Sequence, residues 1–73
     1  MSRSVPFTLV LSLLEQNGYQ LAKRRKYPDR STHYFVLFAC PGRPMIGFPV
    51  AGKRVLRKHF ERIKKIISDF DQA

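Results

Sequence analysis

The strongest constraint on the fold is an apolar run at residues 32–39, which reads Thr-His-Tyr-Phe-Val-Leu-Phe-Ala. In an extended chain, successive side chains point to opposite faces of a sheet. The even-numbered side chains from Tyr34 to Phe38 then share one face, and Phe35 and Leu37 share the other. Both faces are largely apolar, which is typical of a strand inside a sheet rather than at its edge. We therefore predict that residues 32–39 form the central strand.

Helical periodicity flanks this strand on both sides. Residues 6–17 carry apolar side chains at i, i+3, i+4 and i+7, with Ser4 as the expected N-cap and Asn17-Gly18 as the stop. Residues 53–70 predict a second helix. Its apolar seam repeats at spacings of 4, 3, 4 and 3 and consists of Leu56, Phe60, Ile63, Ile67 and Phe70, widened by Val55 and Ile66.

Two shorter strands complete the predicted sheet. Residues 19–25 begin apolar and end in charge, and a Pro-Asp turn then reverses the chain into the central strand. Residues 45–50 follow a Pro/Gly turn, and Pro49 limits that strand to an edge or a strand end. The predicted order is α-β-β-β-α, an α+β fold with a three-stranded antiparallel sheet and two helices packed on it. We expect one domain, residues 1–73, because so short a chain can build only one small core.

The charge of the chain narrows its possible partners. Fourteen Lys and Arg residues against five Asp and Glu residues give a formal charge of +9 at pH 7. Such an excess favours a polyanionic partner, which is RNA, DNA, an acidic protein or an anionic membrane surface. Enzymes that act on small neutral metabolites are correspondingly disfavoured.

Cysteine content and hydropathy favour a cytoplasmic protein. Cys40 is the sole cysteine, so the chain has no internal disulfide, and a reducing compartment suits it. The apolar run at residues 5–14 is shorter than the roughly 20 residues of a membrane span. No small-x-small cleavage site follows this run, so we expect it to be the first helix rather than a signal peptide. We expect no membrane association.

A histidine at the start of the central strand is the candidate catalytic residue. The strand would hold His33 in a fixed direction close to solvent, where its imidazole can accept a proton from a ligand. One cluster of cations lies at the same end of the predicted sheet, and a second lies on the last helix. The candidate RNA-binding residues are Lys23, Arg24, Arg25, Lys26, Arg30, Arg54, Arg57 and Lys58. Cations that bind phosphates beside a histidine indicate action on the ribose 2′-hydroxyl of RNA.

This chemistry needs no metal ion or other cofactor, and we expect none. His33, Cys40 and His59 match no common ligand spacing, and the five carboxylates are scattered along the chain. His59 lies beside the apolar seam of the last helix and is expected to be a boundary residue outside the site. A second proton donor is not obvious, and Tyr34 and water are the candidates.

The predicted α-β-β-β-α order resembles that of the HicA family of toxins over about residues 7–67, and four local features add to the resemblance. They are the Asn-Gly-Tyr helix stop at 17–19, the basic strand end at 23–26, the Ser-Thr-His step at 31–33 and the final Lys/Arg-rich helix. HicA proteins are small bacterial mRNA interferases of type II toxin–antitoxin systems, with a fold like the double-stranded RNA-binding domain. The resemblance implies an endonuclease with His33 as its catalytic residue, and a HicB-type antitoxin that covers this histidine. Ser31 and Thr32 stand where the family has glycine and serine.

Two other interpretations remain open. In the first, the chain is a non-catalytic nucleic-acid-binding module, in which the basic last helix supplies all the affinity and His33 is an incidental turn-side histidine that makes one hydrogen bond. In the second, it is an interaction protein whose basic surface docks on an acidic partner. Only the HicA-like interpretation predicts cleavage of RNA in the absence of metal.

Overall fold

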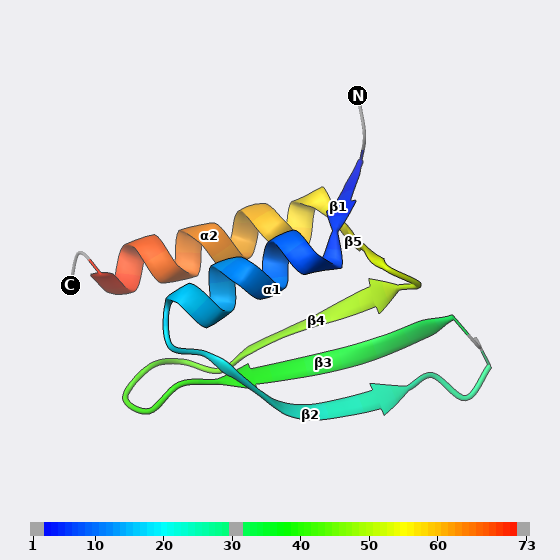
Figure 1. Cartoon of the computed structure of the whole chain (residues 1–73), viewed down its shortest axis with the longest axis horizontal. Coiled ribbons are helices and arrows are strands. Elements are labelled where there is room, and N and C mark those ends of the chain that lie inside the picture. The colour runs from blue at the N-terminus through cyan, green and yellow to red at the C-terminus, as the bar shows by residue number, and fades with distance from the viewer. Residues whose placement is uncertain (1–2, 30–31, 72–73) are drawn as a thin grey trace.

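The computed structural model describes residues 3–29 and 32–71, which form two helices and five strands. In chain order these are β1 (Ser4–Pro6), α1 (Phe7–Gln16), β2 (Gln20–Lys26), β3 (His33–Ala39), β4 (Ile46–Ala51), β5 (Arg54–Leu56) and α2 (Arg57–Asp71). The strands form an antiparallel sheet in the order β1-β5-β4-β3-β2, and both helices lie on one face of it (Figure 1). We call the opposite face the helix-free face, since no described helix covers it. The predicted α+β class is confirmed.

The prediction of three strands is wrong, because β1 and β5 are two additional short strands. Residues 53–56 were expected in the last helix, but Gly52, with a φ of 64°, instead begins a two-residue turn that leads from β4 into β5. Val55 is fully buried whereas Leu56 is 46% exposed, which is the alternation of a strand and not the helical seam. The strand β5 then pairs with β1 through Val5↔Val55. Ser4 therefore belongs to β1, and α1 begins without a side-chain N-cap hydrogen bond.

The central position of β3 is confirmed, because it pairs with β2 on one side and β4 on the other. The strand β4 pairs with β3 along its whole length but with β5 only at Ala51↔Arg54. The strand β4 lies inside the strand order, so it is not the edge strand that Pro49 predicted. The side of β4 that faces β5 is nevertheless unpaired at Pro49, where no N–H group is needed for a ladder hydrogen bond. On that side, Nη2 of Arg62 from α2 donates to the Gly47 carbonyl oxygen at 2.7 Å.

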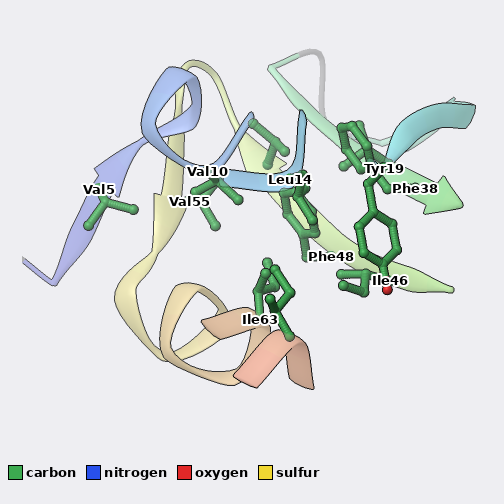
Figure 2. Packing of buried hydrophobic residues seen from close by; sticks show 12 residues of the cluster. Val5, Val10, Leu14, Tyr19, Phe38, Ile46, Phe48, Val55 and Ile63 are labelled. Carbon is green, nitrogen blue, oxygen red and sulfur yellow. The ribbon is translucent and has the colours of Figure 1, made fainter. Parts of the chain in front are cut away.

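The hydrophobic core fills the space between the helices and the sheet (Figure 2). Phe38 of β3 and Phe48 of β4 stack with their ring centroids 5.8 Å apart. The helices contribute four buried side chains, Val10 and Leu14 from α1 and Ile63 and Ile67 from α2. The buried face of α2 is thus smaller than the apolar seam that the sequence predicted, because Phe60 is only partly buried and Phe70 is exposed.

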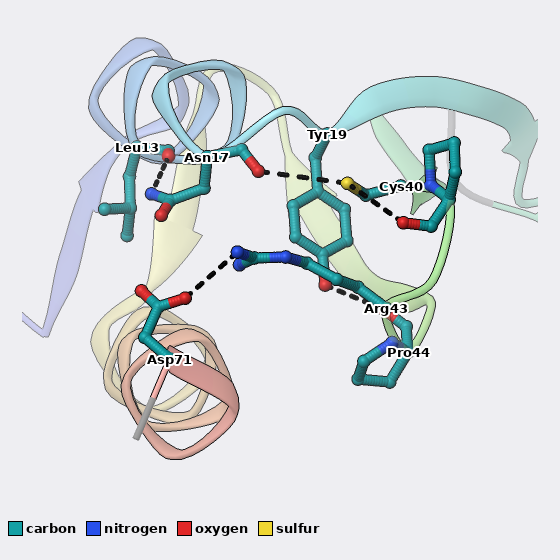
Figure 3. A network of polar contacts seen from close by, with 8 residues as sticks. Leu13, Asn17, Tyr19, Cys40, Arg43, Pro44 and Asp71 are labelled. Carbon is teal, nitrogen blue, oxygen red and sulfur yellow. Dashed lines mark hydrogen bonds and ion pairs between the residues drawn. The ribbon is translucent and has the colours of Figure 1, made fainter. Parts of the chain in front are cut away.

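A polar network joins the start of β2 to the far end of α2 (Figure 3). The helix stop is confirmed, because Gly18 adopts a φ of 84°. The buried Tyr19 donates its hydroxyl to the Pro44 carbonyl oxygen at 2.8 Å, and burial raises the pKa of this phenol. In the same turn Arg43 forms an ion pair with Asp71 at 3.0 Å. These contacts fix one end of the molecule, away from the start of β3 (Figure 1).

Candidate nucleic-acid interface

His33 lies on the helix-free face of the sheet. Residues directly opposite each other in an antiparallel pair share a face, and His33 is opposite Ala51 of β4. Its neighbour Tyr34 points the other way, where its ring packs edge-on against Phe7 of α1 at 6.4 Å. Tyr34 is therefore the wrong choice for a second proton donor, since the sheet separates it from His33.

His33 is one of the residues that line a hollow of about 550 Å³. The walls of the hollow come from the ends of β3 and β4, from β1 and β5, and from the residue that follows β2. Its polar side chains are those of Ser4, Tyr27, His33 and Arg54. Arg54, Tyr27 and His33 thus line one depression, whose volume of about 550 Å³ is large enough to admit a phosphate and its sugar.

Backbone hydrogen bonds hold this corner of the sheet together. Tyr27 N donates to the His33 carbonyl oxygen at 3.3 Å, and Gly52 N donates to the Thr32 carbonyl oxygen at 2.6 Å. The Thr32 hydroxyl oxygen lies 3.3 Å from His33 Nδ1. When Nδ1–H donates to this oxygen, Nε2 keeps its lone pair and can accept a proton. The hydroxyl can also donate to an unprotonated Nδ1, so this contact holds the ring beside Thr32 in either tautomer.

Arg54 is fixed at the rim of the hollow by β1. Its Nε donates to Ser4 Oγ at 3.0 Å, and its Nη2 donates to the Ser4 carbonyl oxygen at 2.9 Å. The sequence placed Arg54 on the last helix, but the strand β5 brings it to the same hollow as His33. Because these hydrogen bonds already hold the guanidinium in place, it loses little further conformational freedom when it binds an anion.

The predicted cation cluster on β2 is divided between the two faces. Lys23 and Arg25 are opposite β3 residues of the helix-free face, so they share that face with His33. Arg24 and Lys26 point to the other side, where the Arg24 guanidinium lies 4.2 Å from the centroid of the Tyr34 ring.

The remaining candidate cations do not join His33. Arg57 and Lys58 begin α2, in the helical layer, and Arg57 N donates to the Arg3 carbonyl oxygen at 2.7 Å. Arg30 lies outside the described residues. Of the predicted RNA-binding residues, the structure thus places Lys23, Arg25 and Arg54 on the face of the candidate catalytic histidine.

His59 is part of α2 and does not line the hollow. Burial lowers the pKa of this imidazole, and the nearby charges of Lys58 and Arg62 lower it further. The folded protein therefore favours the neutral form of His59. This agrees with the predicted position of His59 at the boundary between the core and solvent. As the pH falls below the ordinary histidine pKa of 6.5, the unfolded chain takes up a proton at His59 more readily than the folded chain does. We therefore expect the free energy of unfolding to decrease with falling pH in this range.

Tyr27 and Ser4 were missed by the sequence reasoning. Tyr27 follows the last residue of β2 and so lies beside the first residue of β3, which the predicted hairpin already implied. Ser4 reaches the hollow only because β1 pairs with β5, and three-residue strands leave no periodic signal.

Comparison with known proteins gives no further assignment. No protein-family model, curated protein or solved structure significantly matches this chain. Within residues 3–29 and 32–71, no three or more His, Cys, Asp or Glu side chains are grouped to hold a metal ion. In the same residues, neither helix has the length and apolar content needed to cross a bilayer.

Proposed function

We propose that this chain binds RNA across the helix-free face and cleaves it beside His33. The observation that carries the proposal is the hollow that His33, Tyr27 and Arg54 line together, on a face that also bears Lys23 and Arg25. Phosphates bind to such cations, and the ribose 2′-hydroxyl is the group that distinguishes RNA from DNA at a site of this kind.

The reaction is an internal transfer of the phosphoryl group. His33 Nε2 accepts the proton of the 2′-hydroxyl, and the 2′ oxygen attacks the adjacent phosphorus. The bond from phosphorus to the 5′ oxygen of the next nucleotide breaks, and that oxygen takes up a proton. The products are a 2′,3′-cyclic phosphate and a 5′-hydroxyl end. Arg54 at the rim stabilises the charge that develops on the phosphoryl oxygens.

Tyr27 is the proposed proton donor to the leaving 5′ oxygen, because its side chain lines the same hollow as His33. Tyr27→Phe removes the hydroxyl and keeps the ring, so we expect cleavage to fall by about 10²-fold, near the lower limit for a positioned acid. The rate constant for single-turnover cleavage of an end-labelled RNA measures this. Tyr34→Phe is the matched control on the opposite face and should leave the rate unchanged. Equal rates for the parent and Tyr27→Phe would remove Tyr27 from the mechanism.

The cations of the helix-free face are proposed to hold the RNA phosphates. Reversing Lys23 and Arg25 to glutamate should weaken RNA binding and reduce the slope of log K against log salt concentration by about 1.4, or 0.7 for each lost contact. Affinities measured by fluorescence anisotropy over a salt series provide the test.

The same double reversal of Arg57 and Lys58 is the matched comparison, because it changes the net charge equally. These residues lie in the helical layer, so we expect a smaller loss of affinity. Were the reversal on α2 the more damaging one, the RNA would have to bind the helical layer instead of the helix-free face.

The partner and the cellular location are also proposals. The resemblance to HicA implies an antitoxin of the HicB type that covers His33 and blocks cleavage. A protein with acidic side chains would complement Lys23, Arg25 and Arg54 on the helix-free face. A cytoplasmic location, where mRNA and such an antitoxin meet, completes the proposed function. Copurification of an acidic protein that suppresses cleavage would support this part.

A further inference from the structure

Phe35 is an exposed aromatic residue on the face that the proposed RNA would cross. It is 36% exposed and lies on β3, two residues beyond His33 and on the same side of the strand. Two residues along a strand correspond to about 6.7 Å. A nucleotide next to the one being cleaved can therefore reach this ring.

The Phe35 ring rests on the backbone of β4. Gly47 leaves the necessary space, because a Cβ atom there would lie 2.8 Å from Phe35 Cζ and 2.9 Å from Cε1. One side of the ring is thus held against the sheet, while the rest of it meets solvent. A ring held in this way loses little conformational freedom when a flat ligand stacks on it.

Cations border the ring on the side of β2. Arg25 is directly opposite Phe35, and Lys23 is directly opposite Leu37. These four side chains line a second, smaller hollow of about 200 Å³. An aromatic and aliphatic floor with positive charge along one rim is the arrangement by which proteins bind single-stranded nucleic acid, with bases on the floor and phosphates at the rim.

The distribution of negative charge favours a nucleic acid on this face. The five carboxylates of the chain belong to Glu15 of α1, Asp29 of the turn after β2, and Glu61, Asp69 and Asp71 of α2. None of the described strands therefore carries an acidic residue to repel a phosphate. Packing over Gly47 alone would explain the position of the ring, but it does not require cations on the adjacent strand.

We infer that Phe35 is a stacking platform for one unpaired nucleobase of a single-stranded RNA, with Lys23 and Arg25 binding the phosphates that flank this base. The inference rests on the proposed RNA binding and adds a base subsite beside the cleavage site. It implies that single-stranded RNA binds better than a duplex, because a paired base cannot reach the ring.

The test measures binding in the His33→Ala background, so that the RNA stays intact and the result does not depend on cleavage. Phe35→Leu keeps an apolar cover over Gly47 but removes the aromatic face. We expect it to bind a short mixed-sequence single-stranded RNA about 5- to 150-fold more weakly, the loss that corresponds to one base–aromatic stack. Phe35→Tyr should bind nearly as tightly as the parent, and melting temperatures establish that each variant is folded.

A second measurement needs no change at Phe35. An RNA in which one base is 2-aminopurine should lose fluorescence on binding, because stacking on an aromatic ring quenches this base. Equal affinities of the parent and the folded Phe35→Leu variant, together with unquenched 2-aminopurine, would overturn the platform even if RNA is cleaved. Conversely, a Phe35-dependent loss of affinity without cleavage by the unmodified protein would support the platform and refute only the nuclease.

An acidic protein is the competing occupant of this face. Polyglutamate serves as the probe, since it carries negative charge but no bases. If polyglutamate binds as tightly as RNA and with the same dependence on Phe35, the face is a protein-docking surface and the inference is wrong. Weaker binding of polyglutamate that does not respond to Phe35→Leu would agree with base stacking.

Discussion

Replacing His33 with alanine is expected to lower the rate of RNA cleavage by about 10²- to 10⁴-fold, the usual contribution of a positioned general base. The fold should persist, because the imidazole is only partly buried at the start of β3 and is outside the hydrophobic core. RNA binding should persist as well, since Lys23, Arg25 and Arg54 remain on the helix-free face. Single-turnover cleavage, anisotropy and thermal melting of the same preparation separate these three effects.

His59→Ala is the matched control for this experiment. It removes the other histidine of the chain, which lies on α2 outside the hollow. We expect cleavage by this variant to stay close to that of the parent. Equal losses in both variants, or no loss in either, would show that His33 is not the base.

The largest effect on stability is expected for Phe48→Ala, which should lower the free energy of unfolding by about 3–5 kcal/mol. Phe48 is fully buried, stacks on Phe38, and lies 6.3 Å from the ring of Phe7, so its removal leaves a cavity where the sheet meets α1. Small domains have about 5–15 kcal/mol of stability in total, so this loss brings the chain close to unfolding. Urea unfolding followed by circular dichroism measures it.

The control for this variant is Leu9→Ala on the exposed side of α1. Leu9 is 47% exposed, and we expect a change within about 0.5 kcal/mol. A melting temperature of Phe48→Ala close to that of the parent would mean that β4 does not pack against the helices as described.

The sequence predicted those elements that have a clear apolar pattern or a characteristic stop residue. Apolar side chains on both faces of residues 32–39 indicated a strand with neighbours on each side, and β3 has them. The Asn17-Gly18 step predicted the end of α1, because glycine adopts the left-handed conformation without strain. Ile63 and Ile67 predicted the buried face of α2 through their spacing of four residues.

The edge of the sheet could not be predicted in this way. Leu56 and Phe60 are four residues apart, so the helical spacing continues by chance into β5. Three-residue strands have too little alternation to oppose such a signal, and they form here because β1 and β5 pair with each other across the chain. The same pairing brings Ser4 and Arg54 to the hollow, so this part of the site depends on a long-range contact.

The most direct test of the proposed function is the incubation of the purified chain with mixed single-stranded RNA in the presence of excess EDTA. The account predicts cleavage that EDTA does not inhibit, with 2′,3′-cyclic phosphate and 5′-hydroxyl ends on the fragments. It also predicts that a substrate with 2′-deoxyribose at the cleaved position is bound but left intact. Binding of RNA without cleavage, by a preparation free of any inhibitory partner, would contradict the account and leave a non-catalytic RNA-binding module in its place.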